Sequence, residues 1–110
     1  MHAATKTSSH RVVGRGYLRA LGRTRNAGFT LDRSHVTYVD NAAGIRFRSV
    51  RVSSVGISGH TATLRGTGTL NGKRVAFTVV AMQGTPDRLA VALGRYAHRA
   101  AVVRGFIRVR

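Results

Sequence analysis

The sequence contains no cysteine and no glutamate. Without cysteine, the chain forms no disulfide bond and offers no thiolate to a metal ion. Without glutamate, the only side-chain carboxylates are those of Asp32, Asp40 and Asp87. Chemistry that needs clustered carboxylates or an activated thiol therefore has few residues to use, and we expect neither an enzyme, nor a metal site, nor a cofactor.

Long apolar stretches and helical periodicity are also missing. No stretch approaches the length of a transmembrane helix, and no apolar pattern keeps a helical period for three turns. The first ten residues, MHAATKTSSH, are small, polar and basic, and they lack the apolar centre of a signal peptide. We expect residues 1–10 to form a flexible arm and residues 11–110 to form a single domain.

Short β-branched runs separated by glycine, asparagine and serine fill the rest of the chain. The candidate strands are Val12–Ala20, Ala27–Leu31, His35–Asp40, Ile45–Val52, Val55–Ser58, Thr61–Leu70, Arg74–Gln83, Arg88–Gly94 and Ala100–Arg110. This spacing predicts an all-β fold, a single antiparallel β-sandwich or flattened barrel of about seven to nine short strands.

Three turns connect the predicted strands most clearly. Asn71-Gly72 tolerates the positive φ angles of a type I′ turn, so it predicts a tight hairpin. After it, Val75, Phe77 and Val79 alternate with small or polar residues and are expected to point inward. Residues 40–44 and 85–87 are the other two predicted turns.

The strand Ile45–Val52 changes phase along its length. Ile45 and Phe47 share one parity, whereas Val50 and Val52 have the other. A β-bulge near Arg48-Ser49 returns both pairs to the core. The strand's arginines, Arg46, Arg48 and Arg51, are then expected to face outward.

In the last strand, Gly105, Ile107 and Val109 have the inward parity. The outward parity belongs to Arg104, Phe106, Arg108 and Arg110. Two interpretations stay open: an edge strand that charge protects against pairing with other chains, or a binding face. Gly14-x-Gly16 and Gly66-x-Gly68 open no helix, so they indicate bends or close strand contacts rather than a dinucleotide-binding loop.

The charge balance is strongly one-sided. Lysine and arginine total 19 against three aspartates, which gives a formal net charge of +16, and only two of the 19 are lysines. Guanidinium groups bind phosphate or carboxylate in a bidentate manner and stack on flat rings. The charge therefore favours a polyanionic partner: nucleic acid, an anionic cell-wall polymer or a membrane surface. A surface on which the arginines are simply solvated is the competing interpretation.

The run SGHTATLRGTGTLNG at residues 58–72 has the form G-x-T-A-x-(L/I)-x-G-x-G-x-(V/L/I)-N-G. Phe77-Thr78-Val79 and Asp87-Arg88-Leu89-Ala90-Val91 follow it in a matching order. On these motifs, residues 14–110 resemble the post-COAP domain family and related β-rich modules of secreted bacterial proteins. The resemblance implies a small antiparallel domain on an exported protein, without a catalytic role. The short segment Gln83–Pro86 and the basic charge depart from that family, so no cation site is carried over.

Two constellations could suggest chemistry. Asp32, Ser34 and His35 contain the residue types of a catalytic triad, but Asp32-Arg33-Ser34 is also typical of a turn, which we favour. The five histidines, His2, His10, His35, His60 and His98, show no metal-binding spacing.

Basic residues alternate with rings in three segments, at residues 15–19, 46–48 and 104–108. Phe47 has the opposite parity to its flanking arginines and is expected in the core, whereas Phe106 shares a face with Arg104 and Arg108 and could stack on a base. The candidate polyanion-binding residues are Arg46, Arg48, Arg51, Arg104, Phe106, Arg108 and Arg110. They predict a non-enzymatic binding or structural module, secreted or associated with the cell wall, that holds an anionic polymer. The alternative is a cytoplasmic nucleic-acid-binding β-domain.

The net charge makes a prediction about stability. Self-repulsion among so many like charges opposes folding, and salt screens it. We therefore expect the melting temperature to rise as sodium chloride is added, measured by circular dichroism. A melting temperature that falls with salt would show that favourable ion pairs outweigh the repulsion.

Overall fold

The computed structural model describes residues 11–19, 26–41 and 44–109. The predicted arm at residues 1–10 lies outside them, as does Arg110. The described residues form strands and turns without a helix, which confirms the all-β prediction. The strands are β1 (Val12–Arg19), β2 (Asn26–Asp32), β3 (Val36–Asp40), β4 (Ile45–Ser58), β5 (Thr61–Leu70), β6 (Lys73–Met82), β7 (Arg88–Leu93) and β8 (Tyr96–Val109).

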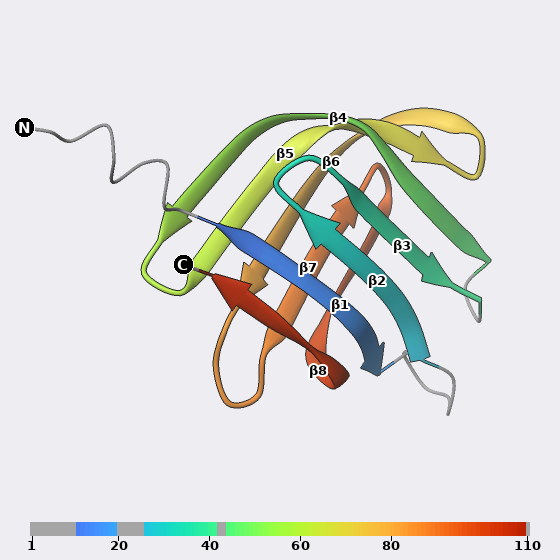
Figure 1. Cartoon of the computed structure of the whole chain (residues 1–110). Coiled ribbons are helices and arrows are strands. Elements are labelled where there is room, and N and C mark those ends of the chain that lie inside the picture. Colours follow the sequence, from blue (N-terminus) through green and yellow to red (C-terminus); the bar gives the residue numbers. More distant parts are fainter. Residues whose placement is uncertain (1–10, 20–25, 42–43, 110) are drawn as a thin grey trace, which may run out of the picture.

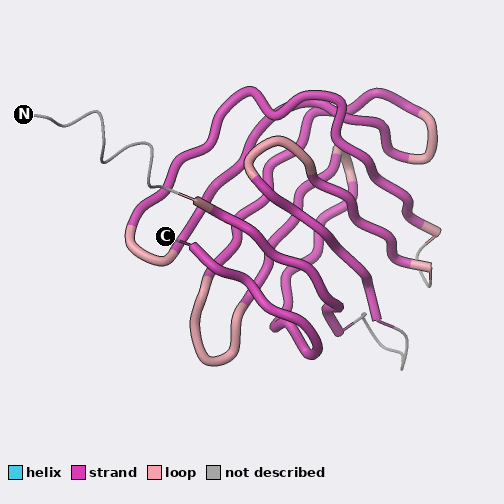
Figure 2. The backbone as a smooth tube through the Cα atoms, viewed as in Figure 1, coloured by secondary structure: helices cyan, strands magenta, loops and turns pink. Residues whose placement is uncertain are grey.

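Each strand pairs antiparallel with the next, and β8 pairs with β1, so the sheet closes into a barrel (Figure 1). Turns and short loops join most of the successive strands (Figure 2). The β1–β8 register runs from Val12 opposite Val109 to Leu18 opposite Val102. The flattened-barrel alternative is therefore compatible with the structure, whereas the sandwich alternative is wrong. Alternating apolar residues occur in both architectures, so the alternation could not separate them.

The last strand is not an edge strand along its whole length. β1 pairs with β8 along one side, and β7 pairs with its first half on the other. Along the second half of β8, residues of the loop between β6 and β7 accept hydrogen bonds in place of a neighbouring strand. The backbone N–H groups of Ile107 and Val109 donate to Asp87 Oδ2 (2.9 Å) and Gln83 Oε1 (2.8 Å). Two side chains thus satisfy amides that a neighbouring strand would otherwise bind.

The predicted strands at residues 45–52 and 55–58 are one long strand, β4. Its register against β5 shifts between Ser49 and Arg51 and again between Val52 and Ser54. The first shift leaves Val50 as the extra residue, and its side chain is 57% exposed. The prediction that Val50 points inward is therefore wrong, because the bulge lies at Val50 itself. Phe47 is buried, as expected.

β1 and β8 approach each other closely at a pair of glycines. Gly16 lies opposite Gly105 in the register, and their φ angles are +147° and +105°. A Cβ atom on Gly16 would lie 2.0 Å from the carbonyl oxygen of Arg104, and one on Gly105 would lie 2.1 Å from that of Arg15. No larger residue fits at either position, which confirms the predicted close strand contact for Gly16.

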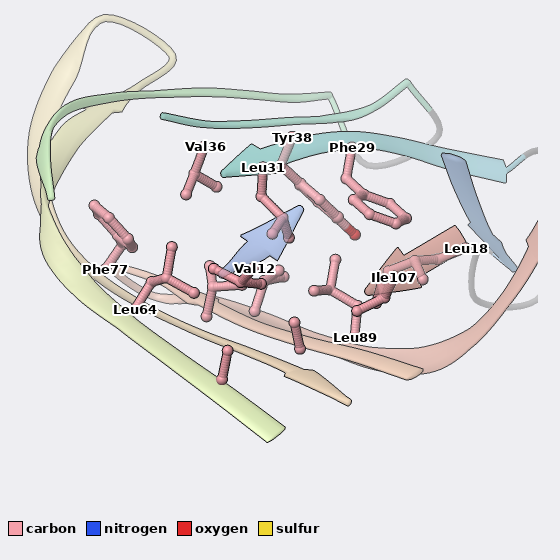
Figure 3. Packing of buried hydrophobic residues seen from close by; sticks show 14 of the residues in the cluster. Val12, Leu18, Phe29, Leu31, Val36, Tyr38, Leu64, Phe77, Leu89 and Ile107 are labelled. Atoms are coloured by element: carbon pink, nitrogen blue, oxygen red, sulfur yellow. The ribbon is translucent and has the colours of Figure 1, made fainter. Parts of the chain in front are cut away.

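The barrel interior is a packed hydrophobic core (Figure 3). Leu18, Tyr38, Leu64 and Ile107 enter it from four different strands and are almost completely buried. The rings of Phe47 and Phe77 meet edge to face, with centroids 5.3 Å apart. Side chains fill the interior, as in other small barrels, so a binding surface has to be formed by the outward-facing positions.

The hairpin between β5 and β6 turns at Asn71 and Gly72, whose φ angles are 51° and 85°. Both are positive, which confirms the type I′ turn. The Asn71 side chain also binds the turn between β3 and β4. Its Oδ1 accepts from Arg46 N, and its Nδ2 donates to Gly44 O, both at 2.8 Å. One residue therefore connects two turns at the same end of the barrel.

We predict that Gly72→Val lowers the free energy of unfolding by about 1 kcal/mol or more, because a β-branched residue resists positive φ. Gly56→Val is the matched control. A Cβ meets no atom within 4 Å at either glycine, but only Gly72 has a positive φ. Urea unfolding of both variants measures the difference. Equal effects of the two substitutions would show that the turn geometry contributes nothing.

Candidate polyanion-binding surface

The predicted polyanion-binding residues lie on two strands, β4 and β8. Arg104 and Arg108 are exposed on β8, and Phe106 between them is half-buried. Arg46, Arg48 and Arg51 are exposed on β4. Three strands, β1, β2 and β3, separate the two groups in the sheet, so the structure does not bring them into direct contact.

The register nevertheless joins the two groups through outward-facing neighbours. One cross-strand row contains Phe106, Arg15, Thr30, Thr37 and Arg48, and the next contains Arg104, Tyr17, Gly28, Val39 and Arg46. No residue of either row is acidic. At the usual strand spacing, the two ends of a row lie about 19 Å apart along the sheet.

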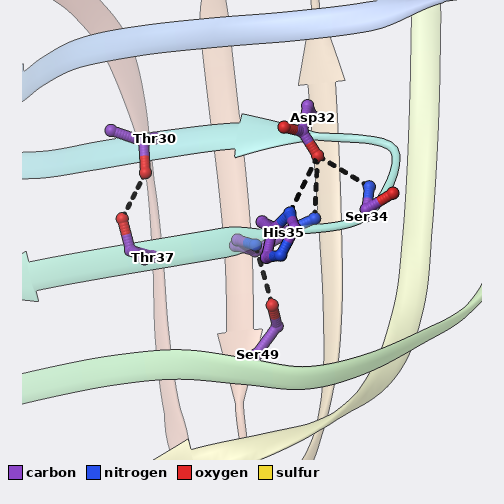
Figure 4. A network of polar contacts seen from close by, with 7 residues as sticks. Thr30, Asp32, Ser34, His35, Thr37 and Ser49 are labelled. Carbon is purple, nitrogen blue, oxygen red and sulfur yellow. Dashed lines mark hydrogen bonds and ion pairs between the residues drawn. The ribbon is translucent and has the colours of Figure 1, made fainter.

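A shallow depression of about 510 Å³, which we call the outer hollow, lies within these rows. On β2 and β3 it is lined by Gly28, Val39, the buried Phe29, and Thr30 and Thr37. The hydroxyl groups of Thr30 and Thr37 hydrogen-bond to each other (Figure 4). Arg15, Tyr17 and Arg104 line it on β1 and β8. A second depression, of about 310 Å³, includes Arg46 and Arg48.

The rings of this surface differ in accessibility. Tyr17 is 47% exposed, and its ring leans over Gly28, where a Cβ would lie 3.2 Å from Tyr17 Cε1. The Phe106 ring is half-buried, and the Arg108 guanidinium carbon lies 5.3 Å from its centroid. That cation–π contact already occupies the ring that the sequence favoured. Tyr17 is the more accessible ring.

Sequence reasoning missed Tyr17 although its segment contained the signal. Arg15 and Arg19 stand two residues before and after it, so all three share one parity along a strand. Shared parity with two flanking arginines was also the reason for selecting Phe106. What the sequence could not show is that Arg104 of the last strand lies directly opposite Tyr17.

All three carboxylates accept hydrogen bonds that hold the fold. Asp32 Oδ1 accepts from the backbone N–H groups of Ser34 (2.7 Å) and His35 (2.9 Å), the turn that the sequence favoured over a triad (Figure 4). Asp87 accepts from Gly84 N and Ile107 N. Asp40 is buried and accepts from the Tyr96 hydroxyl.

Asp40 belongs to a polar cluster inside the barrel. The hydroxyl groups of Tyr38 and Tyr96 lie 2.8 Å apart, and Tyr96 donates to Asp40 Oδ2 at 2.8 Å. Burial raises the pKa of Tyr38 to about 12, helped by the nearby negative charge of Asp40. Burial also raises the pKa of Tyr96, and its hydrogen bonds to Tyr38 and Asp40 add to the effect. Both hydroxyls therefore stay protonated at neutral pH.

No group of three or more histidine, aspartate, cysteine or glutamate residues that could hold a metal ion occurs in the described part of the chain. Nor do the residues that the structure describes include a helix long and apolar enough to cross a membrane.

No family model, curated protein or solved structure matches this chain. The resemblance to post-COAP modules therefore stays a prediction.

The tyrosine cluster predicts how stability depends on alkaline pH. Burial raises the pKa of Tyr38 from its ordinary value of about 10 to about 12 in the folded chain. The folded chain thus holds a proton that the unfolded chain loses, so the stabilisation is full below about pH 10 and declines as pH rises toward 12. We expect the free energy of unfolding, measured in urea, to fall across this window. Tyr38→Phe should show a smaller fall, and an equal fall in both proteins would contradict the assignment.

Proposed function

We propose that this protein is a non-enzymatic binding module whose basic outer surface associates with anionic polymers. One observation carries the proposal. Every arginine whose side chain the structure describes is exposed, while the carboxylates of Asp32, Asp40 and Asp87 are engaged as hydrogen-bond acceptors within the fold. The two outward rows that run from Phe106 to Arg48 and from Arg104 to Arg46 present positive charge and contain no acidic residue, whereas the neighbouring row places Asp32 two strands from Arg108.

Such a surface attracts polyanions for a general physical reason. Phosphate-rich polymers carry condensed counterions, and each phosphate that an arginine neutralises releases some of them. Arginine adds bidentate geometry, which favours phosphate and carboxylate groups. Binding of this kind is strong at low salt, weak at high salt and largely independent of sequence.

The resemblance to modules of secreted bacterial proteins supports an exported protein that holds an anionic wall polymer. A nucleic-acid-binding domain is the second candidate function, and the exposed ring of Tyr17 beside Arg15 and Arg104 favours it. A structural accessory whose charge has no partner is the third.

The test compares two triple variants that remove the same charge. Arg15→Ser, Arg104→Ser and Arg108→Ser act on the proposed surface. Their control is Arg65→Ser, Arg88→Ser and Arg99→Ser, which removes exposed arginines from β5, β7 and the first half of β8.

We predict that the first triple flattens the plot of log affinity against log salt by up to about three units on duplex DNA, because each lost phosphate contact removes about 0.9. The control triple should change the slope less. Fluorescence anisotropy with labelled duplex DNA at several salt concentrations measures both slopes. Equal slopes for the two triples would show diffuse attraction to the whole barrel, and no binding by the parent at low salt would refute the proposed function.

A further inference from the structure

Guanidinium and apolar groups alternate where β1 meets β8. The three outward cross-strand pairs are Val13 with Arg108, Arg15 with Phe106, and Tyr17 with Arg104. Each pair joins one arginine to one apolar side chain, and Val13 and Tyr17 are 43% and 47% exposed. A surface that only attracts charge needs no exposed apolar groups between its arginines. This arrangement suits a ligand that carries both anionic and flat apolar parts.

The outer hollow has the shape and chemistry to take a flat ring. Gly28, Thr30, Thr37 and Val39 line it on β2 and β3 together with the buried Phe29, and the Tyr17 ring stands beside it over Gly28. Thr30 and Thr37 share one hydrogen bond between their hydroxyls. One of the two hydroxyl protons is consumed by that bond, so the other can donate to a ligand, and both oxygens keep accepting capacity. A base offers donors and acceptors of this kind along its edge.

Covering Gly28 is the purely structural role that Tyr17 could have, because an aromatic ring shields a glycine on a neighbouring strand. The exposure of Tyr17 shows that much of the ring remains accessible after that contact. Phe106 offers a less accessible ring for stacking, since the Arg108 guanidinium already lies over it.

We infer that the anionic polymer is single-stranded nucleic acid and that one unstacked base lies in the outer hollow against Tyr17. Arg15 and Arg104, which line the same hollow, hold the flanking phosphates. The strand continues toward Arg46 and Arg48 at the far end of the two rows. This inference rests on the proposed binding of polyanions, and of the two candidate ligands it selects nucleic acid over an anionic wall polymer.

Other polyanions use this surface less completely. Polyphosphate, teichoic-type polymers and anionic lipid headgroups can contact the arginines, but they contain no aromatic ring to stack on Tyr17. Duplex DNA presents phosphates while its base faces stay inside the stack. Single strands expose both phosphates and base faces, and aromatic stacking with arginine contacts is how sequence-tolerant single-strand binders hold them.

The experiment changes the hollow while leaving every charge in place. Gly28→Val places a branched side chain in the hollow, at a position where φ is not positive. Gly56→Val is its matched control, an exposed glycine in β4 with open space around it. Tyr17→Ser removes the ring, and Tyr17→Phe keeps a ring that can stack. Melting temperatures establish whether each variant is folded. If Tyr17→Ser does not fold, Gly28→Val still tests the hollow.

The probes are a short labelled oligo(dT) and inorganic polyphosphate, whose affinities are measured by anisotropy and by competition at one salt concentration. We expect Tyr17→Ser to weaken oligo(dT) binding roughly 5- to 150-fold, the range measured for loss of one stacking ring. Gly28→Val should weaken it in the same direction. Tyr17→Phe and Gly56→Val should leave it within about twofold, because both keep the ring and the hollow. Polyphosphate affinity should stay unchanged throughout.

Two results separate the inference from the proposed function. If Tyr17→Ser and Gly28→Val leave oligo(dT) binding unchanged, or weaken both polymers equally, the hollow holds no base and the inference is overturned while polyanion binding stands. If the parent binds neither polymer at low salt, both are overturned.

Discussion

Pairing between the first and last strands is the constraint on which the rest of the structure depends. It closes the sheet, and it requires the backbones of Gly16 and Gly105 to approach closer than any Cβ atom permits. Were this seam open, β1 and β8 would each present unpaired amides and carbonyls to solvent. Because the seam is closed, the outward-facing residues of β8 lie beside those of β1, which in turn lie beside those of β2. One surface therefore combines arginines from distant parts of the sequence.

The other side of β8 depends on a different device. There the sheet ends early, and Asp87 and Gln83 supply the acceptors that a strand would supply. A chain with only three carboxylates thus uses one of them to complete its barrel, and Asp32 and Asp40 have comparable tasks in a turn and in the core. All three side-chain carboxylates of this strongly basic chain are therefore used as hydrogen-bond acceptors within the fold.

Local patterns predicted the local features. Asn71-Gly72 identified the type I′ turn because two adjacent positive φ angles need those residue types, and parity placed Phe47 and Ile107 inside and Arg104 and Arg108 outside. These conclusions involve only neighbours along one strand or one hairpin.

Features that depend on distant partners could not be predicted in this way. Apolar and polar residues alternate along the strands of a sandwich and of a barrel alike, so the sequence pattern could not show that the sheet closes on itself. The bulge at Val50 follows from how β4 pairs with β5, which the phase change located only approximately. The candidate surface was found in part. Parity gave the outward arginines, but only the strand order shows that Tyr17 lies between them, opposite Arg104.

Closure between β1 and β8 also determines how this barrel can be connected to other chains. Val12 and Val109 are paired in the register, so the backbone enters and leaves the barrel at one place, about 5 Å apart. Domains with adjacent ends can be inserted into a surface loop of a host protein without forcing the host's own residues apart. The barrel can therefore be attached to another domain at one point, through two ends that lie side by side.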